Sequence, residues 1–244
     1  MTSLDHVIVA VRDVRSACET WSAALGVPVE RGGRHPGGTE NALGILGSGP
    51  TYVELVAAVD PPTPGSWAEL VGERAGPLTY AIGSDDLDRD VERLRRIGAM
   101  VHDAEPGQRE CLDGQIVRWR SAILGGDSIS RNWPFLIEWP STGPERLGIG
   151  RQTSAPSLVV TELLVAVPEP EELVQVLVAL GWESVPANGR CVAHGVTRIA
   201  VEAAELKRSG PRGLKVAGAG ADVDVVIDGL RVRLSRVAPR TREE

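Results

Sequence analysis

The stretch HVIVAVRDV at residues 6–14 decides how this sequence is interpreted, because its pattern returns twice further along the chain. TYAIGSDDL at 79–87 and ELLVAVPEP at 162–170 have the same form, a short apolar run that ends in an acidic turn. An apolar run bounded by turn residues predicts a buried β-strand. Its recurrence at long, similar intervals indicates an array of related supersecondary units.

A predicted helix follows each of these strands and ends on a glycine. The segments CETWSAALG, VERLRRIG and LVQVLVALG end at Gly26, Gly98 and Gly181, and glycine is the residue that a left-handed helix stop favours. Extended segments come next, such as VPVERGG, NALGILG and TYVELVA in the first unit. Each unit therefore reads as strand, helix and three strands, and the sequence predicts an α+β fold of tandem βαβββ units.

This order of elements resembles the vicinal-oxygen-chelate superfamily, which includes glyoxalase I, extradiol dioxygenases and bleomycin-resistance proteins. LDHVIVAV, GGRHPGGTEN, YVELVA, LRRIGA, VRWR and PFLIEWP are similar to signature stretches of its glyoxalase-like domain branch. The resemblance covers about residues 3–141, and from about 158 onward it rests on the repeat alone. It implies two paired units whose sheets curl into a cup-shaped mixed sheet.

We expect the paired domain to occupy residues 1–142, followed by a Pro/Gly-rich linker at 143–157, a third, partial βαβββ unit at 158–238 and a tail at 239–244. Near the C-terminus, VDVVIDGLRVRLSRV predicts a strand pair that turns at Asp228-Gly229. A single unit leaves a sheet edge uncovered. The third unit should therefore pack against the first two or form a homodimer through its equivalent.

Composition narrows the class of ligand. The 244 residues are 42% hydrophobic and 24% charged, which describes an ordinary globular protein. A net charge of −7 argues against nucleic acid and anionic membranes as partners and leaves small molecules. No apolar run approaches the ~20 residues of a spanning helix, and the start lacks a signal-peptide pattern, so we expect a cytoplasmic protein. The three cysteines show no CxxC spacing, so neither a zinc knuckle nor a disulfide framework is indicated.

The resemblance also implies a metal site, because the superfamily takes ligands from the first and last strands of each unit. The matching positions are His6, Glu54 and Glu138, and the fourth position is Thr79, or Tyr80 after a one-residue slip. One imidazole and two carboxylates would suit Mn²⁺, Ni²⁺, Fe²⁺ or Zn²⁺. Glu54 and Glu138 are the candidate catalytic carboxylates. The alternative is a metal-free cup in which these carboxylates lie on the exposed face of alternating strands.

Two further segments carry candidate substrate-binding residues. GGRHPGGTENALG at 32–44 offers Arg34, His35 and Asn41 among glycines that allow a ligand to approach the backbone closely. In VRWR, Arg118 and Arg120 share one face of a predicted strand and Trp119 lies on the other. If the arginine face is concave, it binds a carboxylate or phosphate; if it is convex, the pair is solvated.

Two functions of different classes remain. The first is a glyoxalase-like enzyme of lyase or isomerase type that acts on a small oxygenated, anionic substrate. The second is a non-catalytic protein of the resistance type that binds an aromatic compound, for which Trp119, Trp139 and the nearby Trp133 would supply stacking walls.

Overall fold

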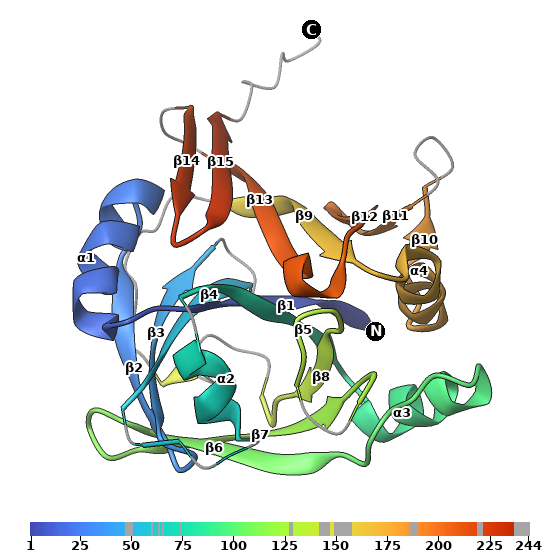
Figure 1. Cartoon of the computed structure of the whole chain (residues 1–244), viewed down its shortest axis with the longest axis horizontal. Helices are drawn as coiled ribbons and strands as arrows, with labels where there is room; N and C mark the ends of the chain where they lie inside the picture. The colour runs from blue at the N-terminus through green and yellow to red at the C-terminus, as the bar shows by residue number, and fades with distance from the viewer. Residues whose placement is uncertain are drawn as a thin grey trace, which may run out of the picture.

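The chain folds into two β-sheets that lie against each other in the computed structural model (Figure 1). The structure describes residues 1–46, 51–59, 61–62, 64, 66–73, 75–126, 129–141, 147–148, 158–185, 190–218 and 222–236. These residues contain fifteen strands and four α-helices, so the α+β prediction with tandem βαβββ units is confirmed. Of the helices in these ranges, none has the length and apolar character needed to cross a bilayer. The predicted tail, and all of the predicted linker except residues 147–148, lie outside the described residues.

The first sheet is a closed barrel with the strand order β1-β4-β3-β2-β6-β7-β8-β5. Its first unit comprises β1 (Thr2–Ala10), α1 (Val14–Leu25), β2 (Val29–His35), β3 (Thr39–Ile45) and β4 (Tyr52–Ala58). Its second unit comprises β5 (Gly76–Ser84), α3 (Leu87–Arg96), β6 (Glu105–Cys111), β7 (Ile116–Ile123) and β8 (Phe135–Glu138). A short helix that the repeat pattern does not contain, α2 (Trp67–Glu73), connects the two units.

Local sequence signals set the limits of the barrel helices. Asp13 caps α1 by accepting a hydrogen bond from the backbone N–H of Ser16, and Gly26 ends the helix with φ 68°. Asp86 caps α3 in the same way through the N–H of Arg89. Acceptor side chains at the first residue and a left-handed glycine at the stop satisfy backbone groups that a helix leaves unpaired.

The second sheet has seven strands in the order β10-β11-β12-β9-β13-β15-β14. Its strands are β9 (Val159–Val167), β10 (Glu183–Ser184), β11 (Cys191–His194), β12 (Thr197–Ala203), β13 (Gly210–Gly218), β14 (Val223–Ile227) and β15 (Leu230–Arg236), and the helix α4 (Pro170–Ala179) lies between β9 and β10 in the chain. The strand β9 pairs in parallel with β12 and antiparallel with β13, just as β1 pairs with β4 and β5. The region after residue 158 therefore holds a full third unit and, in β13 to β15, the strands of a reduced fourth unit.

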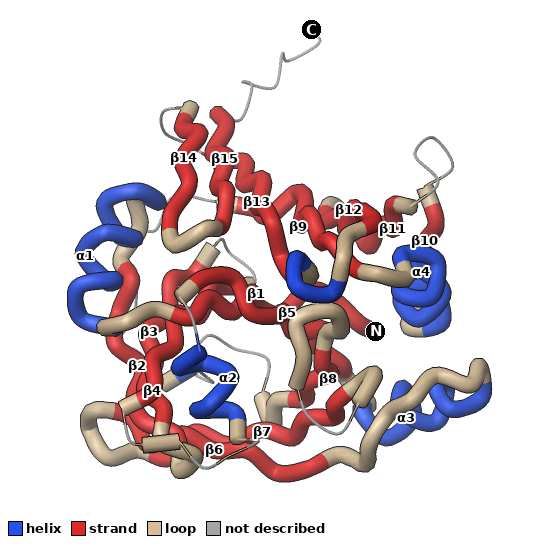
Figure 2. The backbone as a smooth tube through the Cα atoms, viewed as in Figure 1, coloured by secondary structure: helices blue, strands red, loops and turns tan. Residues whose placement is uncertain are grey.

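The two sheets share one hydrophobic core, to which α1, α3 and α4 contribute buried side chains. The second sheet lies along one side of the barrel, with β13 beside β5 (Figure 2). Two hydrogen bonds tie them together: Trp21 Nε1 donates to Asp228 Oδ2 at 2.8 Å, and Thr2 Oγ1 donates to the Leu180 carbonyl at 2.7 Å. The predicted hairpin at Asp228-Gly229 is confirmed, with φ angles of 44° and 78°. A homodimer stays a prediction.

Closure of the barrel between the two units depends on a glycine. The strands β2 and β6 pair only at Gly33–Cys111 and Arg34–Glu110, and Gly33 has φ 149°. A Cβ at residue 33 would overlap the backbone carbonyl oxygen of Glu110, which cannot move away as a flexible side chain could.

Gly33→Ala should therefore lower the free energy of unfolding by about 3 kcal/mol or more, because it adds a backbone clash to a strained φ. Denaturant unfolding measures this loss. Gly37→Ala is the matched control, since nothing lies within 4 Å of its Cβ position, and it should change stability by less than about 1 kcal/mol. Equal stabilities for the two variants would contradict this account of barrel closure.

Candidate functional site

A β-bulge in β1 turns two consecutive side chains, Asp5 and His6, toward the same side of the sheet. The register of β1 against β5 shifts between Leu4 and His6, which leaves Asp5 as the extra residue. Neighbouring residues of a regular strand point to opposite faces, and a bulge re-aims one of them. Asp5 and His6 are each 2% exposed, and Asp5 Oδ1 lies 2.7 Å from His6 Nδ1.

The other ring nitrogen of His6 faces a second carboxylate. His6 Nε2 lies 3.3 Å from Oε2 of Glu54, which belongs to the neighbouring strand β4. Asn41 on β3 donates from Nδ2 to Glu54 Oε1 at 2.7 Å. The His6 ring stacks on Tyr52 with a centroid separation of 4.5 Å and meets the Phe135 ring edge-on at 5.6 Å. The imidazole is therefore fixed between two carboxylates and two aromatic rings inside the barrel.

His35 lies on the other side of Glu54. Its Nε2 is 3.9 Å from Glu54 Oε1, and its Nδ1 is 2.9 Å from the Thr39 hydroxyl oxygen. Burial lowers the pKa of His35, Glu54 opposes this shift, and the positive charge of Arg109 adds to it together with His6. His35 is thus held in the neutral form at neutral pH.

A buried arginine completes the group. Arg109 on β6 is 3% exposed, and its Nη1 donates to Asn41 Oδ1 at 3.4 Å while its Nη2 donates to the Leu147 carbonyl. A second bulge, at Gly32 on β2, makes this contact possible. A Cβ at residue 32 would overlap Asn41 Oδ1 and lie 2.8 Å from Arg109 Nη1.

The structure thus brings together four predicted site residues, His6, Glu54, Asn41 and His35, although their roles stay predictions. Asp5 and Arg109 were not predicted. A signal for Asp5 exists, because a carboxylate beside a histidine within the apolar run SLDHVIV indicates an irregular strand. Arg109 gives no such signal, since GQRECLDG reads as an ordinary polar hairpin.

Glu138 was predicted to join His6 and Glu54, but the structure does not bring it to them. In β8, Phe135 and Ile137 pack in the cluster that contains Ile8, whereas Leu136 packs in the core shared with the helices, so Glu138 lies on the outer face. Its Oε1 accepts a hydrogen bond from the backbone N–H of Leu87 at the start of α3.

Strand register explains why Glu138 lies elsewhere. The antiparallel pairs His6–Ala81 and Ile8–Thr79 relate the two units by an approximate two-fold axis, so that Thr79 corresponds to His6 and Ala81 to Ile8. Ile8 pairs with Glu54 in the first unit, and Ala81 pairs with Phe135 in the second. The counterpart of Glu54 is therefore Phe135, three residues before Glu138.

The predicted three-ligand metal centre does not fit these residues. At the corresponding positions the second unit supplies the phenyl ring of Phe135 and the hydroxyl of Thr79. The Thr79 hydroxyl donates a hydrogen bond to the Trp133 carbonyl. Within the described residues, no three His, Cys, Asp or Glu side chains are grouped so as to hold a metal ion. His6 and Glu54 remain as two donors that contact each other.

The predicted arginines lie outside the barrel. Arg120 pairs with Asp88 at 2.6 Å and with Glu138 at 3.1 Å, and its hydrogen bond lowers the pKa of Asp88. Arg118 and Arg34 are exposed. The face that carries Arg118 and Arg120 is the convex one, because Ala122 on the same side of β7 packs in the core under the helices.

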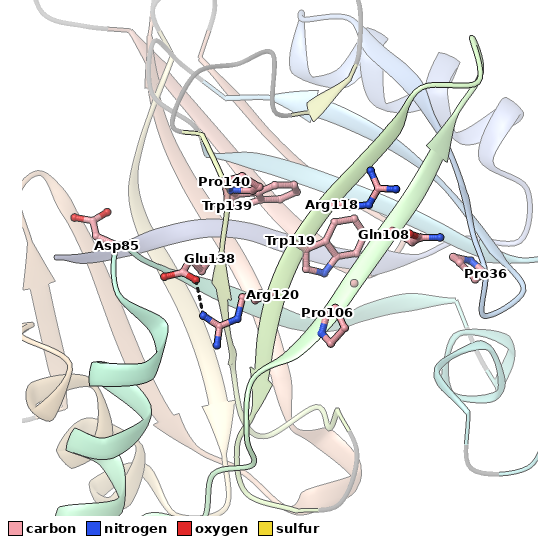
Figure 3. Close-up of a pocket in the computed structure, with 11 residues that line it drawn as sticks. Pro36, Asp85, Pro106, Gln108, Arg118, Trp119, Arg120, Glu138, Trp139 and Pro140 are labelled. Carbon is pink, nitrogen blue, oxygen red and sulfur yellow. Dashed lines mark hydrogen bonds and ion pairs between the residues drawn. The ribbon is translucent and has the colours of Figure 1, made fainter.

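Beside these arginines a groove of about 700 Å³ runs past the end of β8 (Figure 3). Trp119 and Trp139 lie along it with ring centroids 5.5 Å apart, together with Pro36, Pro106 and Pro140. Gly107 leaves room for the Trp119 indole, which a Cβ there would overlap. Trp139 Nε1 donates to Asp5 Oδ2 at 3.1 Å. The groove wall therefore contacts the buried group of Asp5, His6 and Glu54 directly.

The sequence also matches a known family. The profile of the glyoxalase-like domain aligns with residues 4–181, from β1 to just beyond α4. The chain belongs to the glyoxalase-like domain family. The resemblance to the glyoxalase-like domain that the sequence motifs indicated is therefore confirmed. No curated protein matches this glyoxalase-like chain in sequence.

Solved structures resemble this glyoxalase-like protein at low identity. A hypothetical protein from Staphylococcus aureus is 14% identical, covers 97% of this chain and 100% of its own, and has a TM-score of 0.78. A mutant 4-hydroxymandelate synthase from Streptomyces coelicolor is 16% identical, covers 88% of this chain and 71% of its own, and has a TM-score of 0.58. Methylmalonyl-CoA epimerase from Mycobacterium tuberculosis is 23% identical over 57% of this chain and 88% of its own, with a TM-score of 0.43. The first two likenesses show the fold alone.

The neutral His35 predicts a dependence of stability on pH. Because its pKa is lowered in the folded protein from an ordinary value of 6.5, the unfolded chain binds a proton more readily below that pH. The stabilisation is complete above about pH 6.5 and declines as the pH falls, by at most about 1.4 kcal/mol per pH unit. His35→Gln should remove this part of the acid dependence. Unfolding curves between pH 7 and pH 5 measure it, and parallel profiles for parent and variant would contradict it.

Proposed function

We propose that this glyoxalase-like protein is an enzyme that moves a proton on a small oxygenated substrate, and that Asp5, His6 and Glu54 carry out the transfer. The observation that supports this most is the buried imidazole between two carboxylates, at 2.7 Å from Asp5 and 3.3 Å from Glu54. Ionisable side chains are costly to bury in their charged forms, so three of them in contact inside a barrel support a chemical role.

The chain of contacts assigns a part to each residue. Asp5 accepts the Nδ1–H of His6 and thereby fixes the orientation of the ring. A hydrogen bond between His6 Nε2 and Glu54 Oε2 needs one proton, which either atom can carry. Glu54 keeps some exposure, at 8%, whereas His6 is almost fully buried. Glu54 is therefore the group that meets the substrate, and His6 is the proton reservoir behind it.

In the proposed step, the Glu54 carboxylate takes a proton from a carbon next to a carbonyl group. The electron pair of the C–H bond moves into the carbonyl system and gives an enolate. Return of the proton to another position completes an isomerisation, and loss of a leaving group from the enolate completes a lyase reaction. Both reaction types begin with the same proton removal. The step uses only side chains of this chain, with Glu54 as the base and His6 and Asp5 behind it.

Proton removal can be measured before the substrate is known. Small ketones, aldehydes and oxo acids are incubated with the protein in deuterium oxide, and exchange of carbon-bound hydrogen is followed by NMR. Glu54→Gln should slow the exchange roughly 100- to 10,000-fold, the range of general-base effects. Glu138→Gln is the matched control and should retain the exchange, because Glu138 lies on the outer face. Exchange should also survive dialysis against a chelator, and equal rates in all three proteins would sink the proposal.

The groove supports a second candidate, a protein that binds a planar aromatic compound without chemistry. Its two indoles and three prolines form an apolar wall, and Arg118 is an exposed cation beside it with no ion-pair partner among the described residues. Such a wall suits stacking and cation–π contact with an aromatic anion.

This alternative predicts binding that depends on the groove. A panel of aromatic carboxylates should quench tryptophan fluorescence, and Trp119→Leu should weaken the affinity at least about tenfold, as the loss of a stacking contact with its buried area would. Trp182→Phe changes a buried tryptophan between α4 and β10 and serves as the control. Aromatic binding without any hydrogen exchange would favour the binder, and exchange without aromatic binding would favour the enzyme.

A further inference from the structure

We propose that Arg109 binds an oxyanion of the substrate, a carboxylate or a phosphate, inside the barrel. The inference rests on the proposed function for the position of the reacting carbon, but anion binding itself does not require turnover. It assigns the anionic group to an arginine that the sequence patterns did not single out.

The first observation is a buried guanidinium without a carboxylate partner. Arg109 is 3% exposed and forms no ion pair among the described residues. By contrast, Arg120 and Arg231, which do pair with carboxylates, lie at the surface. Taking a guanidinium out of water is unfavourable, and hydrogen bonds to neutral acceptors compensate only part of the lost hydration. An anion in contact with Arg109 would supply the missing compensation.

Arg109 has hydrogen-bond donors that could bind such an anion. An arginine has five N–H donors in a planar fork. One contact goes from Nη1 to Asn41 and one from Nη2 to the Leu147 carbonyl, and both acceptors are uncharged. Nε is buried and has no hydrogen-bond partner. An Nε–H next to a second N–H of the fork is the edge that a carboxylate or phosphate binds with two parallel hydrogen bonds.

A glycine keeps one side of the guanidinium clear. A Cβ at Gly32 would lie 2.8 Å from Nη1 and 3.1 Å from Cζ of Arg109. A side chain at this position would therefore crowd the arginine fork.

The geometry also limits the size of the substrate. The Asn41 carboxamide donates to Glu54 at 2.7 Å and accepts from Arg109 at 3.4 Å, so one amide group separates the base from the cation. A molecule that places an oxyanion on Arg109 and a C–H bond on Glu54 must be short. This points to small acids that carry a carbonyl group one or two carbons from the charge, as 2-oxo and 3-oxo acids do, or to their phosphate counterparts.

The experiment compares charged and uncharged probes on the full chain. Pyruvate, acetoacetate and inorganic phosphate are titrated by calorimetry and by thermal shift, with methyl pyruvate as the uncharged probe. We expect at least one anion to bind and methyl pyruvate to bind far more weakly. Carboxylate binding without phosphate binding, or the reverse, identifies which oxyanion the site takes.

Variants locate the binding. Arg109→Met should weaken anion binding about 10- to 100-fold, the range for a lost hydrogen bond to a charged group. Arg109→Lys keeps the charge and loses the fork, so it should bind less tightly than the parent. If Arg109→Met does not fold, Arg109→Lys still tests whether the arginine fork binds the anion. Arg15→Met, an exposed arginine on α1, is the matched control and should bind as the parent does.

The outcomes separate the two proposals. If no anion binds the parent, or if the Arg109 variants bind as tightly as the parent, the role of Arg109 is overturned. If anions bind through Arg109 while Glu54→Gln leaves hydrogen exchange unchanged, the proton-transfer function fails and the anion site stands. An adventitious surface site would appear as binding that Arg109→Lys and Arg109→Met leave intact.

Discussion

The antiparallel pairing of β1 with β5 is the constraint on which the rest of this structure depends. It joins the two units back to back, and each of its strands also pairs in parallel with the last strand of its own unit. This arrangement brings the first and last strands of both units to one place in the barrel, where His6, Glu54 and Phe135 meet. The second sheet repeats the pairing through β9 and β13. That sheet is open, with β10 and β14 as its end strands, whereas the first one closes through the pairing of β2 with β6.

The two halves of the barrel have the same backbone and different chemistry. The first unit supplies an imidazole and a carboxylate where the second supplies a hydroxyl and a phenyl ring. Buried charge needs partners, and these come from irregular places: Asp5 from a bulge, and Asn41 and Arg109 beside a second bulge at Gly32. Local departures from regular sheet therefore make a polar centre possible in an otherwise apolar interior. Because the Phe135 ring takes the position equivalent to Glu54, the carboxylates of that centre, Asp5 and Glu54, come from the first unit.

The charges outside the barrel serve a different purpose. Arg120, Asp88 and Glu138 join β7, β8 and the start of α3, so their contacts orient a helix against the sheet. Exposed ion pairs of this kind contribute little to the free energy of unfolding. Their role here is to fix the position of α3 against the sheet. Because the fold hosts many reactions and binders, family membership does not choose between an enzyme and a binding protein. The choice rests on the side chains within the barrel and along the groove.

The sequence by itself determined the units, since strand periodicity, N-cap residues and helix-ending glycines are local properties. The hairpin turn at Asp228-Gly229 was also predictable, because the two residues themselves favour it. With the family resemblance, the sequence also indicated His6, Glu54, Asn41 and His35, which lie on adjacent strands of one unit. Only the tertiary structure decided which face of β8 is directed into the barrel, and so placed Glu138 on the outer face, because that orientation is set by pairing with β5 and not by the sequence of four residues. The bulge that turns Asp5 inward depends likewise on register against another strand. Arg109 reaches Asn41 from 68 residues away, because β2 and β6 meet only when the barrel closes.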